Sequence, residues 1–107
     1  MRKRIVVDNL NRTSLNDLII KLNNSVKNSL ATMIIDYEGL IIYSTVPETE
    51  NMSLLAVFVR EIVSRILSMI DLFGANKINT VVIRVDKYAF HIFPLEKIIG
   101  VVIARRS

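Results

Sequence analysis

The side chains that could take part in catalysis or metal binding are few and lie far apart in this chain. His91 is the only histidine, and it alternates with Phe90 and Ile92 in an apolar stretch, which is typical of a structural residue in a β-strand. The chain has no cysteine, which excludes disulfides, cysteine–zinc sites and thiol chemistry. A general base needs a second group held in geometry with it, and His91 has no such neighbour in the sequence. We therefore expect no catalytic residue and no metal site.

Two other patterns could carry chemistry, and both have simpler interpretations. Asp36 and Glu38 are separated by one residue and precede Gly39, so turn and capping roles are favoured over acid–base work. The three glycines are isolated from one another, so no phosphate-binding loop is present. The chain is therefore not expected to be a GTPase itself, or to hold a cofactor.

Length and charge limit the class of protein. The chain has 107 residues, 51% of them hydrophobic, which is enough for one domain with a proper core. The formal net charge is +4, and basic residues gather at both ends: Arg2, Lys3, Arg4, Arg12, Arg105 and Arg106. Such clusters are solvated tails, or they attract an acidic membrane surface or partner. Without a basic face that carries aromatic residues, or a helix-turn-helix pattern, nucleic acid is not an expected partner.

The chain shows neither a membrane-spanning stretch nor a secretory leader, which predicts a cytoplasmic protein. Residues 1–13 are interpreted as a basic lead-in with a short strand at 4–8, and residues 14–107 as the domain. The predicted elements are a helix over 14–28, strands over 30–36 and 40–45, a long helix over 52–73, and strands over 78–86, 88–95 and 97–104.

Local signals mark the ends of these elements. Ser14 with Asp17 resembles a capping box for the first helix, and Thr49 or Asn51 is suited to cap the long helix. Gly39 is suited to the positive φ of a tight hairpin turn, and a glycine also follows the long helix. Several strands are apolar on both faces and need cover on both. The predicted fold is α/β (α+β): a five-stranded antiparallel sheet with helices on its faces, in the order α-β-β-α-β-β-β, without a C-terminal helix.

The long helix carries more apolar surface than one sheet can cover. Its apolar residues spread over about 200° of arc at 100° per residue, whereas a docked surface helix needs a stripe of about 100°. The residues expected to face the sheet are Met52, Ala56, Val59, Val63, Ile66, Leu67 and Ile70. The bulkier second set is Leu54, Phe58, Ile62, Met69 and Leu72, flanked by Glu61 and Arg65. We expect this second set to contact another copy of the chain; the alternative is that the first helix or a tail covers it.

The polar face of the long helix is a second candidate surface. Its residues are Arg60, Ser64, Arg65, Ser68 and Asp71. The face is either plainly solvated or the docking site of a partner protein, and two copies would lie side by side in a dimer.

Several motifs together resemble the Roadblock (dynein-light-chain-like) family. They are the hairpin MIIDYEGLIIYS at 33–44, Pro47, the Leu55-Ala56 pair, Val81-Val82-Ile83, and Phe93-Pro94-Leu95, over about residues 14–104. The resemblance implies a profilin-like domain that dimerises through the long helix and the third strand into a continuous ten-stranded sheet. Strand 78–86 would then be an edge strand paired with its twin, with Asn79, Thr80, Val81, Val82, Ile83 and Arg84 near the two-fold axis.

The resemblance also implies a function. Family members typically act as platforms for small Ras-like GTPases, as regulators, scaffolds or activator subunits, and others serve in motor complexes. Many carry a further helix after the fifth strand, where this chain ends at Ser107. Our main hypothesis is a non-enzymatic homodimer that regulates a small GTPase. The alternatives are a structural scaffold tethered to a membrane or complex through its basic ends, a small-molecule sensor and, least favoured, an enzyme.

Overall fold

The computed structural model describes residues 12–106, with side chains from Ser14 onward. The predicted lead-in over 1–13 and its short strand at 4–8 therefore fall outside the described residues, apart from the first two residues of α2. The elements are α2 (Arg12–Ser25), β1 (Ser29–Asp36), β2 (Ile41–Ser44), α3 (Glu50–Asp71), β3 (Val81–Val85), β4 (Tyr88–Pro94) and β5 (Ile98–Arg105). The predicted order of helices and strands is confirmed, and β5 is the last element of the described chain.

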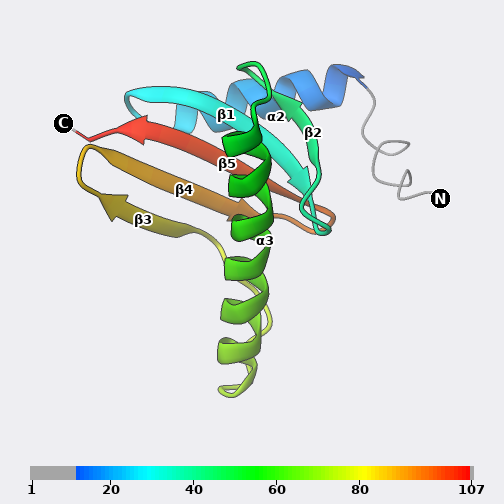
Figure 1. Cartoon of the computed structure of the whole chain (residues 1–107). Helices are drawn as coiled ribbons and strands as arrows, with labels where there is room; N and C mark the ends of the chain where they lie inside the picture. The colour runs from blue at the N-terminus through cyan, green and yellow to red at the C-terminus, as the bar shows by residue number, and fades with distance from the viewer. Residues whose placement is uncertain (1–11, 107) are drawn as a thin grey trace.

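The five strands form one antiparallel sheet in the order β2-β1-β5-β4-β3 (Figure 1). The three tight turns pair β1 with β2, β3 with β4 and β4 with β5, as the sequence predicts. At the centre of the sheet β1 pairs with β5, where Ile34 lies opposite Gly100. The predicted position of the third strand at an edge of the sheet is also confirmed, because β3 has a neighbour on one side only.

A helix covers each face of the sheet, so the strands that are apolar on both faces are buried between two layers (Figure 1). The core under α3 consists of Met33, Ile35, Ala56, Val59, Val63, Ile92, Ile99 and Val101. The core under α2 consists of Ile19, Leu22, Val26, Ile34, Ile98, Val102 and Ala104. The predicted cover on both faces is therefore confirmed.

Local chemistry fixes the ends of α3 and the first hairpin. Thr49 is the N-cap of α3, and its Oγ1 accepts a hydrogen bond from the Met52 N–H at 3.2 Å. Gly74 follows the helix with φ of 77°, and Gly39 closes the β1–β2 turn with φ of 88°. A Cβ at Gly39 would lie 3.3 Å from the Cα of Val57, so this turn also packs closely against α3.

The predicted bounds of two elements, the first helix and the third strand, were wrong. The first helix runs from Arg12 to Ser25, not over 14–28, so Ser14 is its third residue and not its N-cap. Asn28 takes a left-handed conformation with φ of 62°, which a helix does not tolerate and which directs the chain into β1. The third strand begins at Val81 and not at residue 78, because the chain must first return from the far end of α3 to the sheet (Figure 1).

Candidate protein-interaction surface

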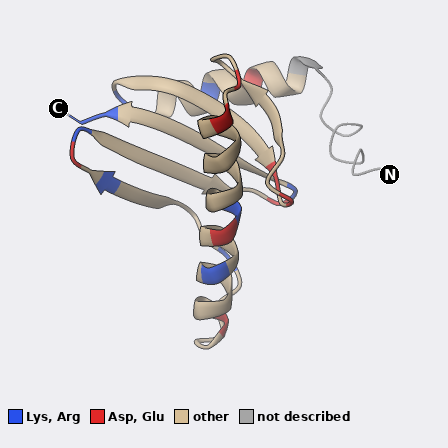
Figure 2. Cartoon of the chain, viewed as in Figure 1, with Lys and Arg blue, Asp and Glu red and all other residues tan. Residues whose placement is uncertain are grey.

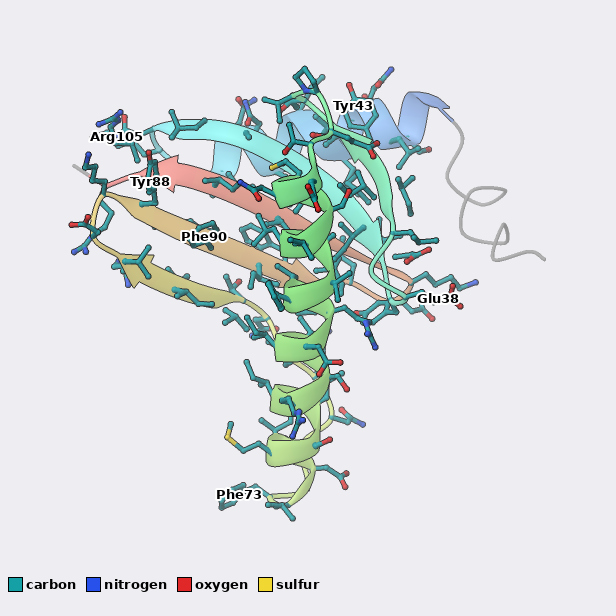
Figure 3. The ribbon with its side chains drawn as sticks, viewed as in Figure 1. Glu38, Tyr43, Phe73, Tyr88, Phe90 and Arg105 are labelled. Carbon is teal, nitrogen blue, oxygen red and sulfur yellow. The ribbon has the colours of Figure 1, made fainter. Side chains whose placement is uncertain are left out.

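The long helix α3 extends well past the sheet that it packs on (Figure 1). It has 22 residues, and a helix of that length measures about 33 Å at 1.5 Å per residue. Ala56, Val59 and Val63 are its buried residues, and no residue of the helix after Val63 is buried. In Figure 3, Phe73 lies just beyond the helix at its far end, away from every strand.

This overhang corrects the predicted sheet-facing set. Ile66 and Ile70 are only partly buried and belong to neither core, in the part of α3 where contact with the sheet decreases toward the overhang. Leu67 does pack against the core as expected. Leu55, which was not assigned to the sheet-facing set, packs there too.

The bulky second set of α3 forms what we call the apolar stripe: Leu54, Phe58, Ile62, Met69 and Leu72. Leu54 is 48% exposed, Phe58 59%, Met69 54% and Leu72 81%, while Ile62 is partly buried. Neither α2 nor any other described element covers these four exposed side chains. Phe73, which the sequence analysis did not assign to a surface, extends the stripe with 85% exposure. The apolar position of Phe73 just before Gly74 was the signal that could have identified it.

Charged residues interrupt the stripe near its middle. Glu61 is close to two arginines, with its Oε2 at 3.4 Å from Arg60 Nη2 and its Oε1 at 3.9 Å from Arg65 Nε. Figure 2 shows these charges as adjoining coloured bands halfway along α3. Because the side chains are largely solvated, these ion pairs contribute little to the stability of one copy.

The outer edge of β3 lies on the same sheet, and its side chains divide between the two faces. Val81 and Ile83 are partly buried and pack against the core under α3. Val85 lies on the same face but is exposed, and Val82 is exposed on the opposite face. Asn79 is exposed and precedes the strand, which begins at Val81, so it lies just before the edge expected near the two-fold axis. Within residues 12–106 nothing pairs with the outer edge of β3.

The predicted polar face of α3 is mostly exposed. Ser64, Arg65, Ser68 and Asp71 are open to solvent, while Arg60 is partly buried. The Nε of Arg60 is buried, and it has no hydrogen-bond partner among the described residues. An unsatisfied buried donor of this kind is costly, so Arg60 is the residue of this face that differs most from a plainly solvated side chain.

Of the residues considered for catalysis, Asp36 has a structural role in the β1–β2 turn. The Asp36 carboxylate accepts hydrogen bonds from the N–H groups of Glu38 and Leu40, at 2.9 and 3.0 Å, which confirms its predicted turn role. His91 lies on β4, and burial together with the Arg84 guanidinium lowers its pKa.

Two absences concern residues 12–106 only. No group of three or more His, Asp or Glu side chains there is placed to hold a metal ion. In the same part of the chain, neither helix combines the length and the apolar character needed to cross a bilayer.

Comparisons with known proteins agree on one family. The family model of the Roadblock/LC7 domain matches residues 15–104. The structure of a Roadblock/LC7 domain from Streptomyces avermitilis is 17% identical, with a TM-score of 0.71, over 84% of this chain and 77% of that one. Myxococcus xanthus MglB is 18% identical, with a TM-score of 0.74, over 89% and 78%.

The gliding protein MglB from Thermus thermophilus is 13% identical, with a TM-score of 0.68, over 83% of this chain and 70% of that one. At such identities these structures establish a shared fold. A search of curated proteins gave no match.

Proposed function

The chain belongs to the Roadblock/LC7 domain family, and from that premise we propose that it is a non-enzymatic homodimer that binds and regulates a small Ras-like GTPase. The single observation that carries the proposal is the exposed apolar stripe of α3 beside the unpaired edge of β3. Structural neighbours described as MglB, one of them in a tetrameric arrangement, support a role in protein assemblies.

The apolar stripe has the symmetry that a homodimer needs. In an antiparallel pair of α3 helices centred on the middle of the stripe, Leu54 of one copy lies opposite Leu72 of the other. The same register sets Glu61 opposite Arg65, so the charges that interrupt the stripe meet opposite charges across the interface. A two-fold interface must be complementary to itself in this way. Phe58 lies between these two contacts on each helix.

The edge of β3 is suited to the same two-fold arrangement. An antiparallel pairing of β3 with its twin would satisfy the open backbone groups of that edge and extend the sheet from five to ten strands. The two α3 helices would then lie on one side of the continuous sheet. Val81 and Ile83 would contribute side chains to the junction between the helices and the paired edges.

The polar face of α3 is the proposed docking surface for the GTPase. Pairing of the helices would bring two copies of Ser64, Ser68 and Asp71 close together on an exposed surface. Arg60, with its buried and unpartnered Nε, is the residue we expect a partner to satisfy. Binding would act through shape and charge complementarity, with no bond made or broken by this chain.

Capture from an extract of the protein's own cells tests this function. The immobilised domain is incubated with extract supplied with GDP or with a non-hydrolysable GTP analogue, and bound proteins are identified by mass spectrometry. We expect a small GTPase to be enriched in one nucleotide state only. Ser64→Arg should abolish this capture without changing the oligomeric mass, whereas Ile20→Arg on the outer face of α2 should leave it intact. Capture that does not depend on the nucleotide would refute the proposal.

A further inference from the structure

A basic hollow lies on the face of the sheet that α2 covers, remote from α3. Because α2 ends at Ser25, it leaves one corner of this face open. Ala89 and Ala104 are paired across β4 and β5 and form a floor of small, buried side chains. The result is a hollow of about 410 Å³ between the end of α2 and the ends of the strands.

Five basic residues line this hollow: the cationic Lys27, Arg84, Arg105 and Arg106, and the neutral His91. They come from the connection after α2, from β3, from β4 and from the end of β5, so the fold gathers them from distant parts of the sequence. The strand register places Arg84 opposite Ala89, beside the floor. Figure 2 shows basic residues at this end of the sheet, near the C-terminus, and Figure 3 labels Arg105 there.

These positive charges have no carboxylate partner within residues 12–106. The ion pairs of that region are the two that Glu61 makes on α3, on the other face of the sheet. No Asp or Glu lines the hollow. The nearest acid along the chain is Asp86, in the β3–β4 turn, and it contributes its backbone carbonyl, which accepts from the Arg106 guanidinium at 3.3 Å. Uncompensated like charges repel, so a bound anion would stabilise this corner.

We propose that this hollow binds a phosphomonoester or diphosphate group, carried by a soluble phosphorylated ligand or by a lipid headgroup. Guanidinium groups bind phosphate oxygens in a bidentate manner and recognise doubly charged phosphates better than single charges. The volume of the hollow falls within the range of about 300–1,000 Å³ that is usual for small-ligand sites. The alanine floor leaves room for the phosphate between Arg84, which is opposite Ala89, and Arg106, which follows Ala104 by two residues and so shares its face.

The site is independent of the proposed GTPase regulation. The hollow opens on the α2 face, whereas the apolar stripe lies on α3. Pairing of the β3 edges would leave both hollows open on the same face of the ten-stranded sheet. A monomer would carry the site equally well, so failure of the dimer would not remove it.

Titration with inorganic pyrophosphate at constant ionic strength tests the proposal. Binding is followed by ¹H–¹⁵N NMR, and we expect shifts at the amides that line the hollow and at the His91 ring. The double variant Arg84→Ala/Arg106→Ala should lose affinity by about tenfold or more, because two charge-assisted contacts are removed. The control Lys77→Ala/Lys97→Ala removes two positive charges elsewhere and should stay within about twofold of the parent. Unchanged signals outside the hollow will show that each variant is folded.

Vesicle flotation distinguishes the two sources of phosphate. Phosphatidylcholine vesicles with phosphatidic acid should capture the parent protein and not the Arg84→Ala/Arg106→Ala variant if the ligand is a lipid headgroup. Pyrophosphate binding at the hollow without vesicle capture identifies a soluble ligand. The proposal is overturned if both double variants lose affinity equally, or if neither pyrophosphate nor vesicles bind at the hollow.

Discussion

Phe58→Asp is the substitution that tests the dimer most directly. Phe58 is 59% exposed in one copy, and full burial of a phenylalanine contributes about 1.5–3 kcal/mol, so its contact with the twin is worth about 1–2 kcal/mol. Each dimer contains two such contacts, and a carboxylate placed in the apolar stripe adds at least about 1 kcal/mol of cost per copy. The total of about 4–6 kcal/mol should raise the dissociation constant by about three to four powers of ten.

Light scattering coupled to size-exclusion chromatography measures this effect. We expect the parent protein to have the mass of two chains and Phe58→Asp the mass of one. The fold itself should survive, because the substituted side chain is largely solvated in a single copy. Ile20→Asp is a matched control, since Ile20 is 56% exposed on α2 and lies outside the apolar stripe, and its mass should stay that of the dimer.

Two results would show that this reasoning is wrong. A parent protein that remains a single chain at high concentration would mean that the apolar stripe does not drive dimerisation. A Phe58→Asp variant with the full dimer mass would mean that the interface lies elsewhere, with the β3 edge as the remaining candidate.

Three further predictions concern stability. Thr49→Ala should lower stability by about 1 kcal/mol through loss of the α3 cap, seen by circular dichroism as a melting temperature lower by about 4–8 °C, which Thr49→Ser should largely restore. Gly39→Ala should lower the free energy of unfolding by about 1–2 kcal/mol through its positive φ alone. The loss should be larger than for Gly74→Ala, because Gly74 has a similar φ but open space around it, whereas Gly39 packs against α3. Equal losses would show that the contact of Gly39 with α3 contributes nothing. Burial and Arg84 lower the pKa of His91 from its ordinary 6.5, so the unfolded chain binds the proton first and stability should fall as the pH drops from 6.5 through the folded pKa. His91→Gln should remove that part of the acid sensitivity in denaturant titrations, and an unchanged pH profile would contradict it.

Structural features that depend on residues close together in the sequence were predicted well. Thr49 and Gly74 delimit α3 because each acts on its own backbone or on the adjacent turn. The β1–β2 hairpin at Gly39 and the β3–β4 hairpin at Asp86 were predicted because turns this short allow only antiparallel pairing of the two strands that they connect. The width of the apolar arc on α3 indicated surplus apolar surface, and Phe58 and Leu72 are indeed exposed.

The errors arise where the sheet decides what a residue contacts. Ile66 and Ile70 have the residue types of a sheet-facing set, but they belong to neither core because the helix extends past the sheet toward its C-terminal end. The sequence pattern predicts a strand from residue 78, but β3 begins at Val81 because residues 78–80 belong to the segment that connects the far end of α3 to the sheet. Neither outcome is visible from periodicity, because periodicity contains no information about where a neighbouring element stops.

The sequence alone determines the elements of this protein, their order, and the surplus apolar surface of α3, since these depend on residues within a few turns of one another. Only the tertiary structure decides that β1 lies beside β5 and that Arg84 and Arg106 share a hollow. The physical reason is that charges and strand edges come together through pairings between distant segments. Such pairings are selected by packing of the whole sheet between two helices.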